Sequence, residues 1–194
     1  MVRKLAVALA LTGLVAVGCA AGANVGRSSA TPNGDPFDES PTSVIANAAL
    51  TDTTGKVVGL ASFSDTRLGV RVDIKVTALP PGKHGAHLHE VGKCDGPDFA
   101  SAGGHFNING QQHGVPGAVN AHAGELPNPV VGPDGKGTLL FYSPATSLNK
   151  AMSNGLTFGR GTALVIHANE DDQKTQPSGN SGARIACGVV KLPA

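Results

Sequence analysis

The feature that most constrains the fold of this chain is a strict alternation of apolar and polar residues. It is clearest over residues 68–79, where valine or isoleucine occupies positions 70, 72, 74 and 76. Because neighbouring side chains of a β-strand point to opposite faces, this alternation predicts a strand with one buried and one exposed face. The Pro-Pro-Gly sequence at 80–82 predicts a turn that ends the strand.

Similar short stretches recur along the chain between turn residues. The expected strands are 44–50, 56–63, 68–79, 84–89, 137–142, 163–167 and 185–192. A helical period is absent, apart from one turn near 148–153, and the 27 glycines suit many tight turns. This pattern predicts an all-β fold, either a sandwich or a barrel. A net charge of +1 without a basic run argues against a nucleic-acid partner.

The first 42 residues differ in composition from the rest. Two basic residues precede an apolar stretch at 5–17 that is too short to span a bilayer comfortably. The sequence Ala-Val-Gly-Cys at 16–19 resembles a bacterial lipoprotein cleavage box. Residues 1–18 are therefore interpreted as a lipoprotein signal peptide and Cys19 as the lipidated residue. The alternative is an ordinary signal peptide with an incidental cysteine.

After cleavage, residues 19–42 are expected to form a flexible tether, because they contain few bulky apolar groups. The folded domain then spans 43–194. The protein is expected to be exported and lipid-anchored to the cell membrane, facing the periplasm or the exterior. Two cysteines remain, Cys94 and Cys187, and in an oxidising compartment such a pair most simply forms a disulfide. The alternative is two buried thiols.

Histidines gather where the alternation stops. Residues 91–131 show no periodicity, yet they include three histidines. Stretches of that length without regular structure are uncommon inside a domain and are usually functional. Just before them, His87 and His89 lie two residues apart on an expected strand, so both point to one face and can bind one ion together. Neutral imidazole suits copper and zinc, and a metal site is predicted.

Several segments resemble the copper–zinc superoxide dismutases in order and spacing. They are His-Leu-His-Glu-Val-Gly at 87–92, Ser-Ala-Gly-Gly-His-Phe at 101–106, the histidines at 113, 122 and 167, and Gly-Ala-Arg-Ile-Ala-Cys-Gly-Val at 182–189. The resemblance covers residues 43–193. The placement of Cys94 five residues after His89, together with the short segment 172–184, is similar to the bacterial, exported branch of that family.

The resemblance implies a Greek-key β-sandwich or barrel of about eight antiparallel strands with long metal-binding loops. It also implies an oxidoreductase that dismutates superoxide to dioxygen and hydrogen peroxide at a copper site, and so protects the cell envelope from extracellular superoxide. Copper would be held by His87, His89, His105 and His167. Zinc would be held by His105, His113, His122 and Glu125, with His105 as the bridge between the two metals.

Further residues have roles by the same resemblance. Arg184 would guide the anionic substrate and His105 would deliver a proton, so both are expected to be catalytic. Asp171 would accept hydrogen bonds from a copper-bound and a zinc-bound histidine, and His84 would support the site through hydrogen bonds. The alternatives are an ordinary loop acid for Asp171 and a surface arginine for Arg184.

Glu125 departs from the family, which typically has aspartate at this position. The additional methylene is expected to move the carboxylate oxygen outward or to force another rotamer. Zinc binding is therefore predicted to be weaker than in an aspartate variant. The alternative for Glu125 is a solvated surface carboxylate.

Two other functions fit parts of the pattern. A non-enzymatic copper-binding envelope lipoprotein on the same fold would keep the histidines, although copper handlers often use methionine-rich tracts and this chain has 2 methionines. A β-sandwich adhesion module would not explain the clustered histidines. The expected partners are superoxide, the membrane through Cys19, and a second copy of the chain in a homodimer whose contact face the sequence does not identify.

Overall fold

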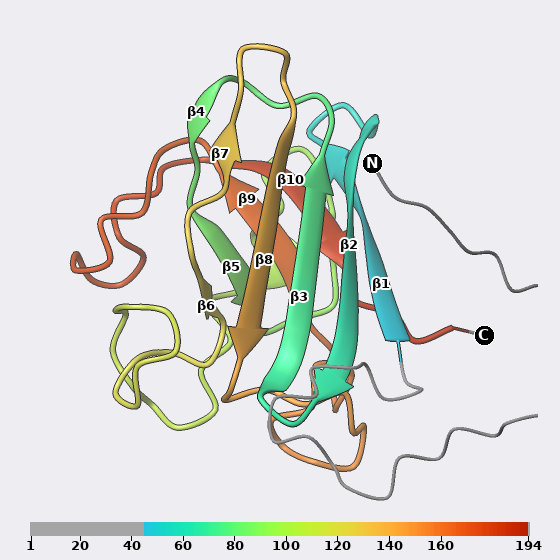
Figure 1. Cartoon of the computed structure of the whole chain (residues 1–194), viewed down its shortest axis with the longest axis vertical. Helices are drawn as coiled ribbons and strands as arrows, with labels where there is room; N and C mark the ends of the chain where they lie inside the picture. The colour runs from blue at the N-terminus through green and yellow to red at the C-terminus, as the bar shows by residue number, and fades with distance from the viewer. Residues whose placement is uncertain (1–44, 194) are drawn as a thin grey trace, which may run out of the picture. The chain divides into compact units, whose positions relative to one another are not determined.

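A computed structural model describes residues 45–193, which form ten β-strands and one short 3-10 helix (Figure 1). The interpreted signal peptide at 1–18, the lipidated Cys19, the tether at 19–42 and the start of the domain at 43 lie outside the described residues. Within residues 45–193, no helix is long and apolar enough to cross a membrane.

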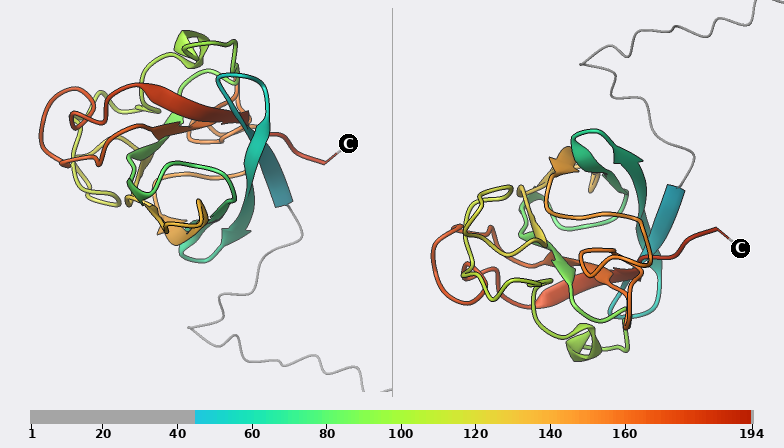
Figure 2. Two further views of the ribbon diagram at one scale, coloured as in Figure 1. Left: turned by 90° about the horizontal axis from the view of Figure 1, so that it is seen from above. Right: turned by 90° about the horizontal axis from the view of Figure 1, so that it is seen from below.

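All the strands pair antiparallel and belong to one sheet that curls into a half-barrel, in the order β4-β7-β8-β3-β2-β1-β10-β9-β5-β6 (Figure 2). Their bounds are β1 Ile45–Asp52, β2 Val57–Thr66, β3 Gly69–Val76, β4 Gly82–Lys83, β5 Ala86–His89, β6 Glu125–Leu126, β7 Val130–Val131, β8 Gly137–Ser143, β9 Ala163–His167 and β10 Arg184–Val189. The predicted all-β fold is confirmed. Neighbours such as β3 with β8 and β1 with β10 are far apart in sequence, as in a Greek key.

The ten strands comprise seven that correspond to the expected ranges and three more, β4, β6 and β7, of two residues each. A two-residue strand has no visible period, so β6 and β7 were not expected within the aperiodic stretch 91–131. The residues near 148–153, where one helical turn was expected, form non-helical turns and bends. The 3-10 helix η1 lies at Ala100–Ala102 instead.

The alternating residues of the central strands form the core. The side chains of residues 70, 72, 74 and 76 on β3 are at most 2% exposed, and they pack with Phe63 of β2 and Leu50 of β1. The intervening residues of β3, at 71, 73 and 75, are partly or largely exposed, and Leu60 on the outer face of β2 is 53% exposed. The prediction of one buried face for this strand is confirmed.

Strands β5 and β9 differ, because every one of their residues is buried. One face, with Leu88 and Ile166, belongs to the main core. The other face is covered by loops, and Val165 there packs with Phe99 in a second, smaller cluster. The two histidines of β5 point to this loop-covered face, which places them under chain segments rather than in water.

A disulfide joins Cys94, in the loop after β5, to Cys187 on β10, with 5.7 Å between the Cα atoms. The predicted disulfide is confirmed, and the alternative of two buried thiols is wrong. Closing a loop of this length contributes about 4–5 kcal/mol in the chain-entropy model. The bond also fixes the loop that packs over β9 to the neighbouring strand.

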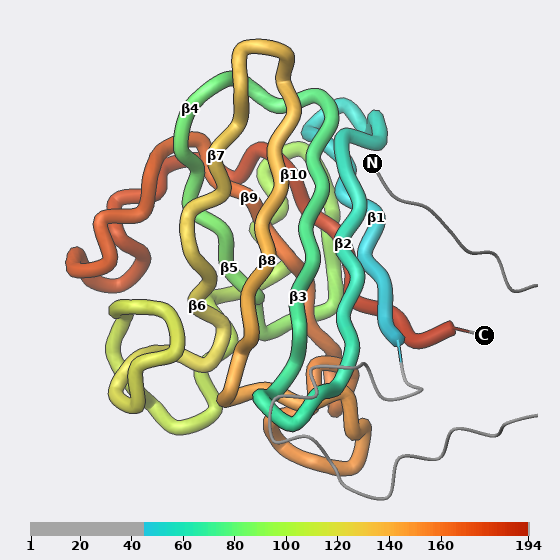
Figure 3. Tube along the Cα trace, in the orientation of Figure 1, coloured from blue at the N-terminus to red at the C-terminus, as the bar shows by residue number. Residues whose placement is uncertain are grey.

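Two long loops lie on the same side of the half-barrel (Figures 1 and 3). We call residues 105–124, which precede β6, the first loop, and residues 168–183, which join β9 to β10, the second loop. Figure 2 shows both of them at the edge formed by β5, β6 and β9. They contain four of the ten polar residues that the sequence suggested for a site, namely His105, His113, His122 and Asp171.

Candidate metal centre

Four buried histidines surround one point on the loop-covered face of β5. One ring nitrogen from each of His87, His89, His105 and His167 lies within 4.8 Å of the others. The backbone determines this arrangement. His87 and His89 share a face of β5, the main-chain N–H of His167 donates to the carbonyl of Gly85 at 2.8 Å, and His105 pairs with His89 through an isolated bridge.

Three of these rings are oriented by a hydrogen bond from the nitrogen that points away from the shared point. The contacts are Nε2 of His87 with Oδ2 of Asp171 at 2.8 Å, Nδ1 of His89 with the carbonyl of Gly103 at 3.0 Å, and Nδ1 of His167 with the carbonyl of Gly182 at 3.2 Å. Because the oxygens accept, these nitrogens carry the proton. The opposite nitrogen of each neutral ring then offers a lone pair.

The nitrogens that face the shared point lack ordinary partners. Nδ1 of His87 and Nε2 of His105 are buried without a hydrogen-bond partner, and Nε2 of His89 lies 3.4 Å from Nε2 of His167. Burying an unpaired polar atom is costly. A four-nitrogen set removes that cost by binding a cation, and it is a donor set that Cu(II) favours. The residues therefore fit copper.

Burial keeps three of these imidazoles neutral. Desolvation lowers the pKa of His87 and His89 well below the usual value, and it lowers the pKa of His167 to about 4. Neutral imidazole is the form that binds a metal. At neutral pH these three rings consequently need no deprotonation before they accept an ion.

A second group lies on the other side of His105. Oε1 of Glu125 is 3.1 Å from Nδ1 of His105, 2.8 Å from Nδ1 of His113 and 2.7 Å from Nδ1 of His122, and the Nδ1 atoms of His105 and His122 are 3.4 Å apart. A tetrahedron with metal–ligand distances of about 2.0 Å has edges of about 3.3 Å. The donor atoms and their spacing fit zinc.

By distance alone, His87 could also be the fourth ligand of the second group, since one of its ring nitrogens lies within 4.8 Å of ligand atoms on His105, His113 and Glu125. We favour His122 instead. The Nε2 atom of His87 is already bound to Asp171 at 2.8 Å, and the free Nδ1 belongs to the first group. The Nδ1 atom of His122, by contrast, contacts only members of the second group among the described residues, and it lies 2.7 Å from Oε1 of Glu125.

Glu125 reaches this group in spite of its additional methylene. It lies on β6, opposite His87 of β5, and it is 1% exposed, so the alternative of a solvated surface carboxylate is wrong. Burial opposes its ionisation, but hydrogen bonding to His105 and the neighbouring imidazoles lower the pKa of Glu125 below its ordinary value. The carboxylate is therefore ionised and able to bind a cation.

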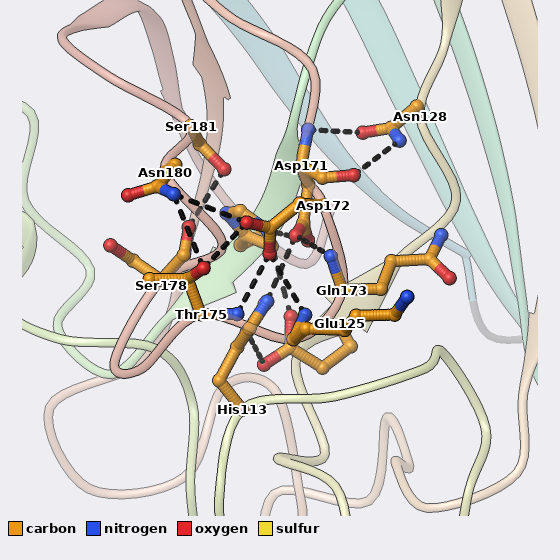
Figure 4. Close-up of polar contacts among 12 residues, drawn as sticks. His113, Glu125, Asn128, Asp171, Asp172, Gln173, Thr175, Ser178, Asn180 and Ser181 are labelled. Carbon is orange, nitrogen blue, oxygen red and sulfur yellow. Dashed lines mark hydrogen bonds and ion pairs between the residues drawn. The ribbon is translucent and has the colours of Figure 1, made fainter.

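Asp171 connects the two groups. Its Oδ2 lies 2.8 Å from Nε2 of His87, and its Oδ1 lies 2.9 Å from Nε2 of His113. Figure 4 shows this carboxylate between His113 and Asn128. Asn128 donates to the main-chain carbonyl of Asp171 at 2.9 Å and accepts from its N–H at 3.0 Å. The carboxylate is 3% exposed, so it is not an ordinary loop acid.

His84 contacts the site through the backbone. Its ring nitrogens lie 2.8 Å from the carbonyl of His167 and 2.8 Å from that of Pro80. It therefore holds the chain at His167 rather than touching a histidine ring. Asn128 acts similarly, but it was not expected from the sequence, because an amide between two prolines in a polar loop has no distinguishing pattern.

Arg184 lines a cleft of about 820 Å³ together with Gly103 and Gly104, which directly precede His105 in the sequence. Its guanidinium donates to the carbonyls of Phe99 at 2.7 Å and Gly103 at 2.6 Å. The carbonyl of Gly103 also accepts from His89, so one oxygen orients both side chains. Partial burial lowers the pKa of Arg184 and the carboxylate of Asp98 opposes that change. The cation is held in place and is not a free surface arginine.

The comparisons with known proteins agree with this geometry. Residues 57–190 match the family model described as copper/zinc superoxide dismutase (SODC). The chain is 45% identical over 155 residues to a Cu-Zn superoxide dismutase of Deinococcus radiodurans, with 74% of this chain and 82% of that protein covered. It is 42% identical over 147 residues to Cu-Zn superoxide dismutase 2 of Aquifex aeolicus, with coverages of 75% and 86%.

Among solved structures, the chain resembles a SOD-like protein from Bacillus subtilis, with a TM-score of 0.70, 41% identity, and 74% of this chain and 96% of that chain covered. The fold, the two histidine groups and the sequence matches agree. The chain belongs to the copper/zinc superoxide dismutase family.

Proposed function

We propose that the chain dismutates superoxide to dioxygen and hydrogen peroxide, with copper in the first group and zinc in the second. The observation that carries this proposal is the set of four buried histidines, each presenting a ring nitrogen to one point beside the anchored Arg184. Family membership makes the chain an oxidoreductase of the superoxide dismutase type. The reaction is 2 O2⁻ + 2 H⁺ → O2 + H2O2.

Copper supplies the one-electron redox chemistry when it is bound, and the protein supplies positioning and electrostatics. His105 offers a nitrogen to each group, Nε2 to the first and Nδ1 to the second. Glu125 and His122 hold the Nδ1 side of this ring in place. Its Nε2 atom can then accept a proton and return it to the reduced substrate without reorienting the ring.

Arg184 brings the substrate to the site. Superoxide is a small anion, and a fixed cation in a cleft raises the rate of encounter at low ionic strength. Its two hydrogen bonds to carbonyl oxygens prevent the guanidinium from swinging away from the cleft. We assign to Arg184 the role of guiding the anion.

A second candidate is a non-enzymatic copper-binding lipoprotein on the same fold. It is favoured by the similarity to a Bacillus subtilis protein that is described as SOD-like rather than as a dismutase. The dismutase is the better-supported candidate, because this chain keeps four converging histidines and Arg184 together.

The cellular setting is also part of the proposal. We infer that the protein is exported, lipidated at Cys19 and protective of the cell envelope, and that two copies associate. The disulfide supports an oxidising compartment. Mass spectrometry of membrane-extracted protein tests the anchor, with a diacylglyceryl-type adduct on a new N-terminus at Cys19 as the expected result. A mature chain that starts elsewhere would refute it.

Superoxide consumption by copper- and zinc-loaded protein, measured with and without a copper chelator, tests the activity. The proposal expects rapid dismutation that the chelator removes and added copper restores. Stoichiometric copper binding without dismutation would favour the copper-binding lipoprotein. Absence of both would refute the metal assignment altogether.

A further inference from the structure

The first and second loops, 105–124 and 168–183, meet at His113. The ring of His113 contacts Asp171 of the second loop, and this contact belongs to the site described above. The main chain of His113 also meets the second loop, at a residue to which the site gives no role. That residue is Gln176, which lies 63 positions further along the sequence.

The side chain of Gln176 binds both main-chain polar groups of His113. Its Oε1 accepts from the N–H of His113 at 2.9 Å, and its Nε2 donates to the carbonyl of His113 at 2.8 Å. A neutral amide side chain offers an acceptor and a donor side by side, which a carboxylate or an aliphatic chain does not. The backbone of one histidine is thus clamped by a residue of the other loop.

The second loop is itself ordered, so Gln176 is presented from a fixed segment. Asp172 accepts hydrogen bonds from the N–H groups of Lys174 and Thr175, the Thr175 hydroxyl and the Asn180 amide (Figure 4). Gly179 has φ +64, and a Cβ there would collide with Asp171 and with the ring of His113. The loop therefore lies directly against the residues that it orients.

We propose that Gln176 is a positioning residue that couples closure of the second loop to zinc binding at His113. This inference rests on the assignment of zinc to the second group. Asp171 fixes the ring of His113 and Gln176 fixes its backbone, and together they direct Nδ1 toward Glu125 at 2.8 Å. By reciprocity, if loop closure favours zinc binding, zinc binding favours loop closure by the same factor.

Zinc affinity of the copper-free protein, measured by competition with a chromophoric chelator, tests whether the contact of Gln176 favours zinc binding. Gln176→Met removes both hydrogen bonds at similar length and is expected to weaken zinc binding by about 10-fold, the lower end of the range for residues that orient a metal ligand. Gln111→Met is the matched control, since Gln111 lies two residues before His113 and its side chain makes none of the hydrogen bonds found within residues 45–193. An unchanged affinity in Gln176→Met would overturn the proposal.

Gln176→Glu sharpens the test because the clamp and simple electrostatics predict opposite results. The variant keeps an acceptor for the N–H of His113 but replaces the donor with an oxygen facing the carbonyl. The clamp predicts weaker zinc binding, although an added negative charge alone would strengthen it. Tighter binding in Gln176→Glu would count against the clamp.

Cleavage by trypsin after Lys174, an exposed residue of the second loop, tests whether zinc binding in turn favours closure of that loop. Saturating zinc should slow this cleavage in the original protein, and the slowing should be about 10-fold smaller in Gln176→Met. A merely structural role would speed cleavage equally with and without zinc, and that result would overturn the coupling.

Neither measurement uses copper or superoxide, so a protein without dismutase activity leaves the inference standing. A protein that dismutates superoxide but binds no zinc would overturn the inference and leave the copper assignment intact.

Discussion

Two regions of this molecule are ordered by different interactions. The barrel half, which we define as β1, β2, β3 and β8, is held by long antiparallel ladders over alternating apolar side chains. The metal half, defined as residues 84–129 and 163–189 with β5, β6, β9 and β10, has short strands, a disulfide and many hydrogen bonds between side chain and backbone. In the metal half, order depends on individual polar contacts rather than on repetition.

The two halves also differ in where titratable side chains are buried. Among the described residues, the buried titratable side chains all lie outside the four strands of the barrel half; they are His84, His87, His89, His105, His113, Glu125, His167 and Asp171. Burying such groups costs stability unless partners or ions compensate. The barrel half thus provides the stability that allows the metal half to hold unpaired imidazole nitrogens.

The largest expected effect separates activity from stability. His89→Ala removes one of the four converging nitrogens and should lower the dismutation rate by more than about 100-fold, beyond the loss typical of a residue that only orients a ligand. The unfolding free energy of the metal-free protein should fall by no more than about 2 kcal/mol, because the barrel half is untouched. Stopped-flow superoxide decay and urea unfolding measure the two quantities.

The matched change in the barrel half is Ile74→Ala. Ile74 is 1% exposed, and its truncation should cost about 2–5 kcal/mol of unfolding free energy while copper binding and activity stay near normal in the folded protein. Full activity in His89→Ala would refute the copper assignment. Loss of copper binding by folded Ile74→Ala would show that the halves are not separable in this way.

The next expected effect is a pH dependence of the metal-free protein. The pKa of His167 is about 4 in the fold because of burial, against about 6.5 for an exposed histidine. The neutral form is therefore favoured by folding, so its contribution is complete above pH 6.5 and is lost as the pH falls toward 4. The loss from this residue reaches at most about 3 kcal/mol.

Urea unfolding of the metal-free protein at several pH values between 7 and 4 measures this loss. His167→Gln has no titrating ring and should show a shallower decline over the same interval. Equal slopes in the two proteins would mean that His167 is not the buried neutral group described here.

The two halves also differed in how far the sequence could predict them. The alternation at 70, 72, 74 and 76 predicted the barrel half, because period-two burial is a local property of a strand. The histidines and Arg184 of the metal half were found through the order and spacing of motifs. Their convergence depends on pairing between segments such as β5 and β9, which a local pattern does not contain.

Three details of the metal half could not be predicted from the sequence, for physical reasons. The reach of Glu125 depends on β6, a two-residue strand without a period. The roles of Asn128 and Gln176 depend on amide groups meeting backbone that is 43 and 63 residues away. Amides in polar loops are ordinarily solvated, so only the assembled loops reveal them.

A smaller effect is expected from removing the anchored cation. Arg184→Ala should lower the second-order rate of dismutation by about 10-fold at low ionic strength, the lower end of the range for electrostatic steering, and should flatten its salt dependence. Copper content should not change, since Arg184 donates to carbonyl oxygens rather than to a metal ligand. A rate at low salt equal to that of the original protein would exclude the guiding role.

The smallest expected effect concerns Glu125. The edges from its Oε1 to the three Nδ1 atoms are 2.7–3.1 Å, shorter than the edge of about 3.3 Å that a tetrahedral zinc site prefers. The longer side chain therefore reaches the site, but its Oε1 would have to draw back slightly from the three imidazoles to reach the spacing of a zinc-bound tetrahedron. Glu125→Asp withdraws the carboxylate by one methylene and should strengthen zinc retention by about 10-fold or less, within the range for adjusting a metal ligand's surroundings. Chelator competition with metal analysis of both proteins decides the point. Equal retention would show that the loop at 105–124 already absorbs the extra methylene.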